Sequence, residues 1–335
     1  MLLEPVQAIL PLNLKQIIYS LPQGIKEGLE EIRIRKQRPL EICSRNHVFF
    51  VNQQAEVVKA PELAYQPTPE ECKCLLELLT NHSLYSFEEE LKRGFITIPG
   101  GHRIGFAGRT LLDGGEVKLV RDVGSFNIRI AREIRGVGEH VLTQLLDHDQ
   151  AGDRIHHTLV ISLPQQGKTT LLRDLARLMS YGDAHPLSGG FPRKSFKVGI
   201  VDERSEIAAC VKGNPSFDLG PRTDVMDACP KAVGMMMMIR SMSPEVLIVD
   251  EIGRKEDVQA IQEARFAGIS VIASAHGAHL DDIRRRPILL ELIASCTFQR
   301  YVVIHRHANG QAQYSIFHAD GRSVEFKQGD RLKRG

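Results

Sequence analysis

The N-terminal part of the chain combines helical and strand-like patterns of apolar residues. Residues 12–35 begin with apolar positions at helical spacing, and residues 31–35 then alternate charged and apolar side chains as in a half-buried strand. Residues 68–92 are again helical in pattern, and Thr68 followed by Pro69 predicts a capped start for this helix.

Beyond Gly94, apolar and polar residues alternate and glycines interrupt the pattern, which is typical of an antiparallel sheet. The sequence Asp113-Gly114-Gly115 predicts a tight hairpin turn between two strands of this sheet. Residues 1–150 are therefore predicted to form a smaller α+β domain with glycine-rich hairpins, and its boundary is expected near residues 140–155.

From Arg154 onward, short apolar runs alternate with helical segments. The runs read HTLVIS, KVGIVD, EVLIVDEIG and ISVIASAHG, and each suits a buried strand. This alternation predicts an α/β domain with a mostly parallel, doubly wound sheet at residues 151–306. Residues 183–192 are expected to form a loop, and residues 307–335 a small C-terminal hairpin and tail with turns at Asn309-Gly310 and Asp320-Gly321.

A phosphate-binding loop is predicted at residues 162–169, SLPQQGKT, because it follows a buried strand and opens a helix. Its backbone N–H groups and the N-terminus of the helix attract phosphate oxygens. We expect Lys168 to reach the terminal phosphates of ATP, Thr169 to ligate Mg²⁺, and Thr170 to hydrogen-bond the α-phosphate.

The loop departs from the usual form at two places. Ser162 stands where a glycine is usual, and it fits there if its φ is negative. Gln165 and Gln166 replace the small residues common in mid-loop, which narrows conformational freedom but leaves their N–H groups available. We therefore expect Ser162, Pro164, Gln165, Gln166 and Gly167 to bind the nucleotide.

A further apolar strand, residues 246–249, ends in the carboxylates Asp250 and Glu251. At the carboxyl edge of a parallel sheet they would face the phosphate loop. Asp250 suits a water-mediated contact with Mg²⁺, and Glu251 suits polarisation of the attacking water. An acidic residue at a strand end is common by itself, but its combination with the GKTT sequence indicates a P-loop ATPase.

Polar residues also follow two other strands on the same rim. Asp202 and Glu203 end one of them, and His276 ends the other. We expect Glu203, or alternatively Asp202, to hold magnesium-bound waters, and His276 to sense the γ-phosphate. A capping or salt-bridge role is the competing interpretation for each.

Two arginines and a run of methionines extend the set of candidates. Arg222 and Arg240 could pair either with phosphate or with the rim carboxylates, and Arg240 is counted among the nucleotide-binding residues. Met235–Met238 are consecutive on a predicted helix and so point in different directions, which favours core packing or a subunit contact over metal binding.

Composition narrows the possible functions. The net charge of +2, the absence of Trp and an aromatic content of 6% give no basic stripe or stacking platform for nucleic acid. No apolar run approaches the roughly 20 residues that span a bilayer, and the N-terminus makes a poor signal peptide. We therefore expect a cytosolic protein whose six cysteines are reduced.

Several long segments resemble the stage III sporulation protein AA family. They include LVISLPQQGKTTLLRDLAR, VGIVDERSEIAAC, RSMSPEVLIVDEIGR, FITIPGGHRIGFAGR and EEIRIRKQRPLEI, so the resemblance covers nearly the whole chain. It implies a cytosolic ATPase of endospore-forming bacteria that acts at the base of a channel between mother cell and forespore, with membrane-embedded partners. This chain departs from the family at Leu163 and Gln165, where members carry Pro and Gly.

More distantly, the chain is similar to type II and type IV secretion and pilus ATPases. That similarity implies a RecA-like P-loop domain and a hexameric ring of identical subunits. It also implies that arginines on the glycine-rich hairpins, here Arg103, Arg109 and Arg121, reach the nucleotide of a neighbouring subunit. The competing interpretation is that these arginines pair with Asp113, Glu116 or Asp122 on the same sheet.

Two other functions remain as alternatives. One is a nucleic-acid-dependent ATPase of the RecA class, such as a helicase. The other is a scaffold that binds ATP with little turnover, which the altered mid-loop would permit, although Lys168, Thr169, Asp250 and Glu251 are all present.

Overall fold

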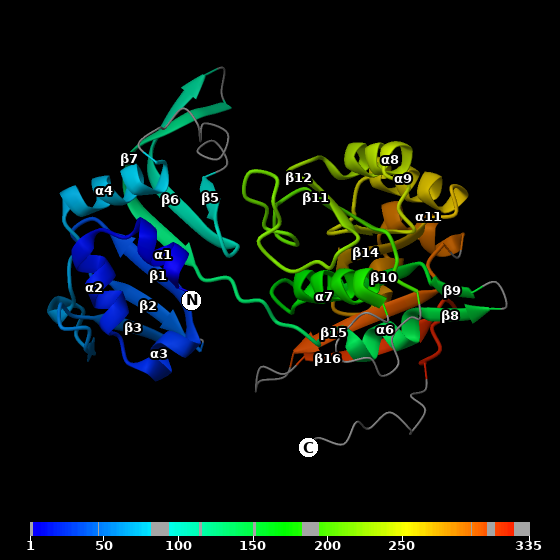
Figure 1. The fold of residues 1–335 in the computed structure, drawn as a ribbon, viewed down its shortest axis with the longest axis horizontal. Coiled ribbons are helices and arrows are strands. Elements are labelled where there is room, and N and C mark those ends of the chain that lie inside the picture. Colours follow the sequence, from blue (N-terminus) through cyan, green and yellow to red (C-terminus); the bar gives the residue numbers. More distant parts are fainter. Residues whose placement is uncertain are drawn as a thin grey trace. The chain divides into compact units, whose positions relative to one another are not determined.

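The computed structural model describes residues 3–45, 47–81, 94–113, 116–149, 152–182, 194–295, 297–306 and 312–324. The chain folds into two compact units (Figure 1). The first comprises Met1–Arg132 together with Ala209–Phe217, and the second comprises Glu133–Ala208 together with Asp218–Gly335.

The first unit is built on an antiparallel sheet of seven strands in the order β4-β3-β2-β1-β7-β6-β5. The strands are β1 (Leu29–Arg35), β2 (Glu41–Ser44), β3 (His47–Val51), β4 (Val57–Val58), β5 (Phe95–Ile98), β6 (His102–Asp113) and β7 (Glu116–Arg129). The helices are α1 (Glu4–Ile9), α2 (Leu12–Ser20), α3 (Gln23–Gly28) and α4 (Pro69–Leu79), and a 3₁₀ turn spans Pro61–Leu63.

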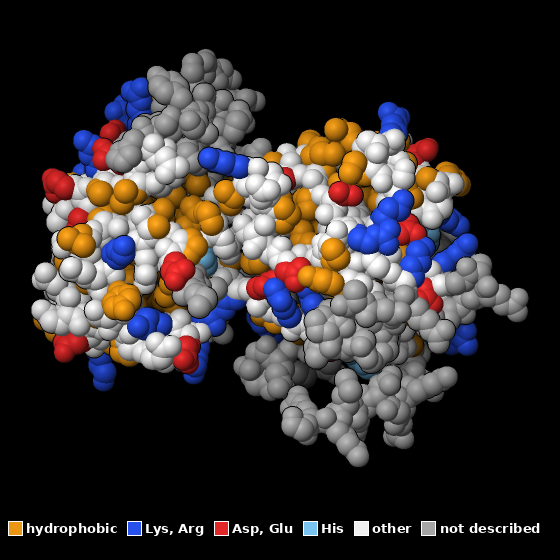
Figure 2. All heavy atoms as spheres, viewed as in Figure 1, with side chains coloured by type: hydrophobic (Ala, Val, Ile, Leu, Met, Phe, Trp, Pro, Cys, Tyr) orange, Lys and Arg blue, Asp and Glu red, His pale blue; other side chains and the backbone are white. Residues whose placement is uncertain are grey.

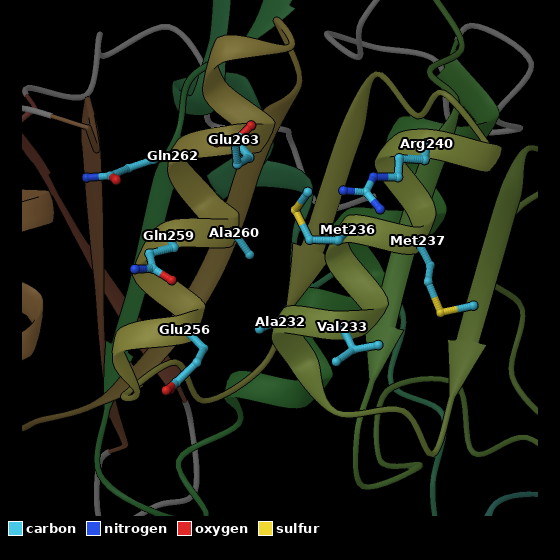
Figure 3. A pocket seen from close by; sticks show the side chains of 10 residues that line it. All are labelled: Ala232, Val233, Met236, Met237, Arg240, Glu256, Gln259, Ala260, Gln262 and Glu263. Atoms are coloured by element: carbon cyan, nitrogen blue, oxygen red, sulfur yellow. The ribbon is translucent and has the colours of Figure 1, made fainter.

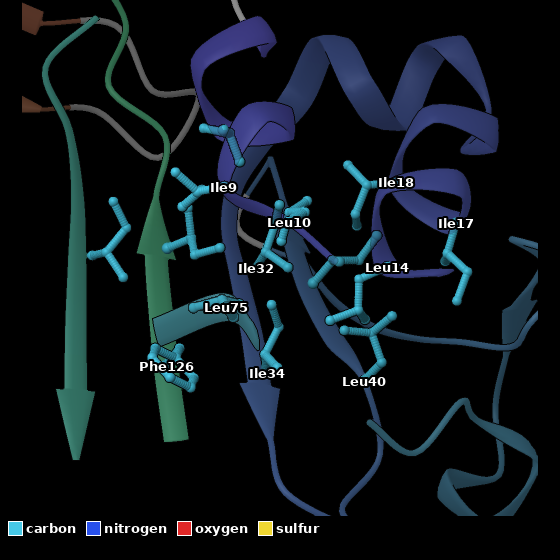
Figure 4. Close-up of a cluster of buried hydrophobic side chains, with 14 of the residues drawn as sticks. Ile9, Leu10, Leu14, Ile17, Ile18, Ile32, Ile34, Leu40, Leu75 and Phe126 are labelled. Atoms are coloured by element: carbon cyan, nitrogen blue, oxygen red, sulfur yellow. The ribbon is translucent and has the colours of Figure 1, made fainter. Parts of the chain in front are cut away.

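Alternation along the strands places the core of this unit between the helices and one face of the sheet. Ile32, Ile34 and Phe126 are buried on that face, together with Leu14 of α2 and Leu75 of α4 (Figure 4). The alternation in residues 31–35 thus predicted the correct face of β1, because successive side chains of a strand point to opposite sides.

The predicted helix start at Thr68 is confirmed, whereas the helical pattern that begins at residue 12 is divided between α2 and α3 and gives way to β1 at Leu29. Thr68 caps α4 by accepting a hydrogen bond from the Glu71 N–H at 3.1 Å, and the Glu71 carboxylate accepts one from the Thr68 N–H at 2.8 Å. α4 ends at Leu79, and residues 82–93 of the predicted helix lie outside the described residues. The hairpin between β6 and β7 forms with Asp113 opposite Glu116, while its two turn glycines lie outside the described part.

The second unit contains a sheet in the order β12-β11-β13-β14-β10-β15-β16 and a small hairpin of β8 and β9. The strands are β8 (Leu146–Asp149), β9 (Gly152–Ile155), β10 (Thr158–Ser162), β11 (Val198–Asp202), β12 (Thr223–Asp227), β13 (Val246–Val249), β14 (Ser270–His276), β15 (Arg300–Arg306) and β16 (Ala312–His318). The helices are α6 (Glu139–Leu145), α7 (Lys168–Tyr181), α8 (Lys231–Ser241), α9 (Lys255–Phe266), α10 (Leu280–Arg284) and α11 (Pro287–Ala294).

Helices cover both faces of this sheet. On one face α8, α9 and α11 share a core cluster with the strands, and on the other α7 packs against β10, β11 and β12 (Figure 1). All neighbouring strands are parallel except β15 and β16, and β10, β11 and β13 are buried throughout. This matches the mostly parallel sheet expected from the alternating apolar runs.

Two boundaries differ from the expected ones. Residues 133–149 pack with the second unit, because α6 contacts α7 and β16 and the Gly138 N–H donates to the Asp174 carboxylate at 2.7 Å. The C-terminal strand β16 pairs with β15 from Arg300–His318 to Arg306–Ala312, so it forms the edge of the main sheet. The predicted turn at Asn309-Gly310 and the loop at residues 183–192 lie outside the described residues.

Candidate nucleotide site

The phosphate loop connects the central strand β10 to α7. Gly167 caps the N-terminus of this helix with φ +105°, a backbone conformation that favours glycine. Ser162 is the last residue of β10, does not have a positive φ, and donates its hydroxyl to the Leu163 carbonyl at 2.8 Å. The condition under which serine can replace the first glycine is therefore met.

Gln165 takes a left-handed backbone conformation, with φ +62°. For a residue with a Cβ this conformation costs on the order of 1–2 kcal/mol. A glycine at this position would adopt the same conformation without strain. Next to it, the Gln166 Oε1 atom is buried and has no hydrogen-bond partner among the described residues.

Lys168 is the first residue of α7 and is only 6% exposed. Its Nζ atom donates to the Ser162 carbonyl at 3.3 Å and lies 2.9 Å from His276 Nδ1. Burial lowers the pKa of this ammonium group, and the charges of Asp250, Glu251 and Glu206 oppose that shift. The lysine is therefore already directed across the loop, as phosphate binding requires.

Thr169 and Asp250 meet across the edge of the sheet. The Thr169 hydroxyl donates to Asp250 Oδ2 at 3.1 Å. Ser274 of β14 donates its hydroxyl to Asp250 Oδ1 and accepts a hydrogen bond from the Glu251 N–H at 2.9 Å. Because Ser274 is fully buried, it fixes both members of the acidic pair with one side chain.

The Glu251 carboxylate contacts two side chains, the imidazole of His276 and the guanidinium of Arg204. Its Oε1 atom lies 2.9 Å from His276 Nε2, and its Oε2 atom lies 2.6 Å from Arg204 Nη1. Glu251 also has a positive φ of +53°, a strained conformation of the kind found at functional sites. Arg204, 59% exposed, reaches this carboxylate from solvent.

The contacts of His276 assign its tautomer. The ammonium group of Lys168 can only donate, so Nδ1 is the acceptor, and Nε2 carries the hydrogen that is donated to Glu251. His276 thereby joins the loop lysine to the carboxylate expected to activate water.

The acidic residues at the ends of β11 and β13 line one small cavity. Its lining residues are Asp202, Glu203, Arg204, Glu206, Lys231, Asp250 and Glu251. Within it, Glu203 forms an ion pair with the buried Lys231. The structure thus brings Glu203 and Asp250 into one cavity. Glu203 forms a salt bridge there, which is the role considered as an alternative to holding magnesium-bound water.

The Asp202 carboxylate anchors the loop that follows β11. Its carboxylate accepts the backbone N–H groups of residues 206, 207 and 208 at 2.8–2.9 Å. Burial raises the pKa of this carboxyl group to about 6, although the three hydrogen bonds oppose the shift.

Arg240 does not join this cavity within the chain. It lies in the last turn of α8, which runs back from the carboxyl edge of the sheet toward the start of β13, and so the helix carries it to the opposite edge. Its expected contact with nucleotide in the same subunit is corrected accordingly. The Arg222 guanidinium likewise hydrogen-bonds the Ser195 carbonyl, and Met235 and Met238 are buried in the core.

The hairpin arginines belong to the first unit. Arg103 lies over the ring of Phe95, 3.4 Å from its centroid. Arg109 and Arg121 are exposed and stand directly opposite each other on β6 and β7, and neither has an ion-pair partner among the described residues. Since like charges in a cross-strand pair repel, this arrangement is open to an anion.

Sequence reasoning missed three residues of the site: Ser274, Arg204 and Lys231. Ser274 lies within an apolar run. The available signal was its spacing of two residues from His276, because residues two apart in a strand point to the same face of the sheet. Arg204 follows Glu203 directly, but its contact with Glu251 depends on how β11 and β13 pair.

The fold and the site together define the class. The X-ray structure of the Legionella pneumophila ATPase DotB superposes with a TM-score of 0.58 at 13% identity, covering 93% of this chain and 82% of DotB. The crystal structure of the pilus retraction motor PilT with bound ADP gives 0.55 at 14% identity, covering 88% and 80%. The chain therefore has the α/β P-loop ATPase fold of secretion and pilus ATPases.

Within that class, the chain belongs to the family described as sporulation stage III, protein AA, whose profile matches residues 3–324. Stage III sporulation protein AA of Bacillus subtilis (strain 168) is 45% identical over 327 residues, which are 98% of this chain and 99% of that protein. The family resemblance expected from the sequence is confirmed. Among the described residues, no helix is both long enough and apolar enough to span a bilayer.

Proposed function

We propose that this protein hydrolyses ATP in the presence of Mg²⁺ and uses the energy to drive a secretion-like channel, or its assembly, during endospore formation. The observation that carries the proposal is the convergence of Lys168, Thr169, Asp250 and Glu251 from α7 and the end of β13. Membership of a sporulation family supports the physiological setting.

The donor set suits magnesium. Thr169 Oγ1 and the Asp250 carboxylate offer hard oxygen ligands 3.1 Å apart, and the described residues contain no group of three or more metal-ligating side chains. Mg²⁺ in such sites is bound through one or two protein oxygens plus substrate phosphates and water, and it neutralises charge on the phosphates. Thr169 and Asp250 would hold the ion.

The remaining roles follow from the side chains themselves. Lys168 binds the terminal phosphates by exchanging the Ser162 carbonyl and His276 for phosphate oxygens. His276, released from the lysine, faces the γ-phosphate. Glu251 accepts the proton of the attacking water once Arg204 leaves its carboxylate. Glu203, held by Lys231, orders water in the same cavity.

The wider assembly forms part of the proposal. The interposition of β14 between β10 and β13 supports a RecA-like arrangement of the ATPase domain. We infer a ring of identical subunits, hexameric by analogy, in which Arg103, Arg109 or Arg121 approaches a neighbour's phosphates. The ring would act in the cytosol at the mother-cell side of the forespore membrane with membrane-embedded channel proteins, and without nucleic acid.

The test is ATP turnover by the purified protein and two variants. Glu251→Gln should lower the rate about 10²–10⁴-fold while ATP still binds, because the amide cannot accept a proton. Lys168→Ala should weaken ATP binding itself, because it removes a charge-assisted hydrogen bond. Glu70→Gln on α4 is a matched control outside the site.

The outcomes also separate the alternatives. A Glu251→Gln protein with more than half the normal rate would refute the catalytic assignment. Stimulation of tenfold or more by single-stranded DNA or RNA would indicate a nucleic-acid-dependent ATPase. ATP binding without turnover in the unchanged protein would indicate a scaffold.

A further inference from the structure

A groove of about 820 Å³ runs between α8 and α9 on the second unit (Figure 3). Its floor consists of Ala232, Met236 and Ala260. Both helices begin at the same end of the groove, so their exposed stripes form its two walls. The groove shares none of its lining residues with the candidate nucleotide site.

The α8 wall is apolar over most of its length. Val233 and Met237 are 56% and 48% exposed, one helical turn apart, and Arg240 follows them. Hydrophobic side chains also gather on the surface around α8 in the space-filling view (Figure 2). Exposed apolar surface rimmed by polar residues marks an interaction site, and methionine is a side chain that adapts to a partner.

The α9 wall carries unneutralised charge. Glu256, Gln259 and Glu263 are exposed and line the groove. Neither Glu256 nor Glu263 forms an ion pair among the described residues, and neither does Arg240 on the opposite wall. The two carboxylates are seven residues apart, which is two helical turns or roughly 10 Å along the axis.

We propose that this groove binds an amphipathic helix of a partner protein, with apolar side chains on the floor and basic side chains facing α9. Two basic residues spaced by seven on the incoming helix would meet Glu256 and Glu263. An acidic residue on its other flank would meet Arg240. The spacing of Glu256 and Glu263 therefore predicts the spacing of the basic residues on the partner helix.

The geometry favours a helix over an extended segment. A strand must pair its backbone N–H and C=O groups with a sheet edge, whereas the groove is walled by the side chains of two helices. A helix satisfies its own backbone and presents anchors at positions i, i+3, i+4 and i+7. The apolar stripe of Val233 and Met237 has the matching one-turn spacing.

The experiment uses two labelled synthetic helices of about 18 residues as probes. Both carry leucines at the anchor positions; one has lysines spaced by seven on the flank that faces α9, and the other has glutamates there. Fluorescence anisotropy with the full-length protein should show the lysine peptide binding at least about tenfold more tightly than the glutamate peptide. Met237→Gln should weaken the lysine peptide several-fold, because it removes an apolar anchor.

Charge exchange provides the decisive arm. Glu256→Lys combined with Glu263→Lys should reverse the preference, so that the glutamate peptide binds more tightly. Glu70→Lys with Glu77→Lys is the matched control, because these residues have the same spacing on α4 of the other unit. Equal binding of both peptides, no binding of either, or an unchanged preference in the exchanged variant would overturn the proposal. So would a self-association, measured by sedimentation, that Val233→Asp abolishes, since a second copy would then occupy the groove.

Discussion

Ser274 shows how much of the candidate site rests on a single hydroxyl group. It receives the Glu251 N–H and donates to Asp250, so it orients the carboxylate that faces Thr169 as well as the backbone that carries Glu251. The sequence predicted the phosphate loop and the acidic pair because each has a recognisable local pattern. Ser274 has only its spacing of two from His276, and its contacts with Asp250 and Glu251 depend on the strand order.

Ser274→Ala should reduce the rate of ATP hydrolysis about tenfold or more. It leaves the partly buried Glu251 N–H without its Ser274 partner and removes one of the hydrogen bonds that hold Asp250, at a cost of roughly 1–3 kcal/mol. Steady-state kinetics should place the loss in kcat rather than in KM for ATP, and Ser274→Thr should retain most of the rate. Ser270→Ala is the control, because that hydroxyl bonds the Ile155 carbonyl at the other end of β14. Equal effects of the alanine variants at 274 and 270 on kcat would argue against a positioning role.

Gln165→Gly should leave the free energy of unfolding unchanged or slightly raised. Relief of the left-handed backbone at φ +62° offsets the entropy that glycine adds to the unfolded chain. Leu163→Gly, at an exposed loop position without a positive φ, should lower the free energy of unfolding by about 0.5–1 kcal/mol. Denaturant titrations of both variants make the comparison. A greater loss at 165 than at 163 would contradict the strain inferred for the loop.

At the scale of elements, the hydrophobic pattern predicted which residues of the strands are buried. The strand order and the unit to which each element belongs depend on contacts between elements. The buried runs at β10, β11, β13 and β14 were predicted from the sequence because parallel strands covered on both faces must be apolar throughout. The order of those strands, and hence the contacts that β14 makes with both of its neighbours, could not be predicted from the hydrophobic pattern. The affiliation of α6 was missed for the same reason, since its contact with Asp174 joins residues distant in sequence.

The junction before β10 should make the fold sensitive to acid. His157 accepts the Val271 N–H through Nδ1, and burial, aided by the charge of Arg265, lowers its pKa from 6.5 to about 4. Below about pH 6.5 the unfolded chain takes up this proton and the folded chain does not, so the contribution to stability falls until about pH 4. After allowance for solvent screening, we expect a loss of about 1–3 kcal/mol.

His157→Asn preserves an acceptor for Val271 but cannot titrate. Its free energy of unfolding should therefore decline less between pH 7 and pH 4.5 than that of the unchanged protein. Asp202, with a pKa raised to about 6, acts in the opposite direction in this range, but its effect is common to both proteins and cancels in the difference. Parallel pH profiles of the two proteins would show that His157 is not the source.

At the scale of the whole molecule, the two compact units divide the proposed chemistry between them. The second carries the phosphate loop and the acidic pair, and the first carries the hairpin arginines. Arg109 and Arg121 repel each other across β6 and β7, and an anion from outside the hairpin would relieve that repulsion. An arginine suits phosphate because its guanidinium is always charged and its planar fork matches the geometry of the phosphate oxygens.

Arg103→Ala or Arg121→Ala should be nearly inactive alone, yet regain activity when mixed with Glu251→Gln. In a mixed ring some interfaces combine an intact arginine with an intact Glu251, and an arginine finger contributes about 10³–10⁵-fold in related phosphoryl transfers. ATP turnover of the mixture, compared with each variant, is the measurement. Arg33→Ala is the control, because Arg33 already pairs with Glu31 on the same sheet. Full activity of the alanine variants at 103, 109 and 121 would remove the hypothesis.

The position of β14 has a practical consequence for chimeras. It separates the strand of the phosphate loop from the strand of the acidic pair, and its own Ser274 and His276 contact residues of both. A hybrid that imports β10, α7 and β13 from a relative would keep its original β14 between the imported strands. The side chains of that β14 would then face residues from another protein. Transplanting β14 together with its two flanking strands should rescue such a hybrid, because the contacts of Ser274 and His276 with Glu251 and Lys168 are then transferred together.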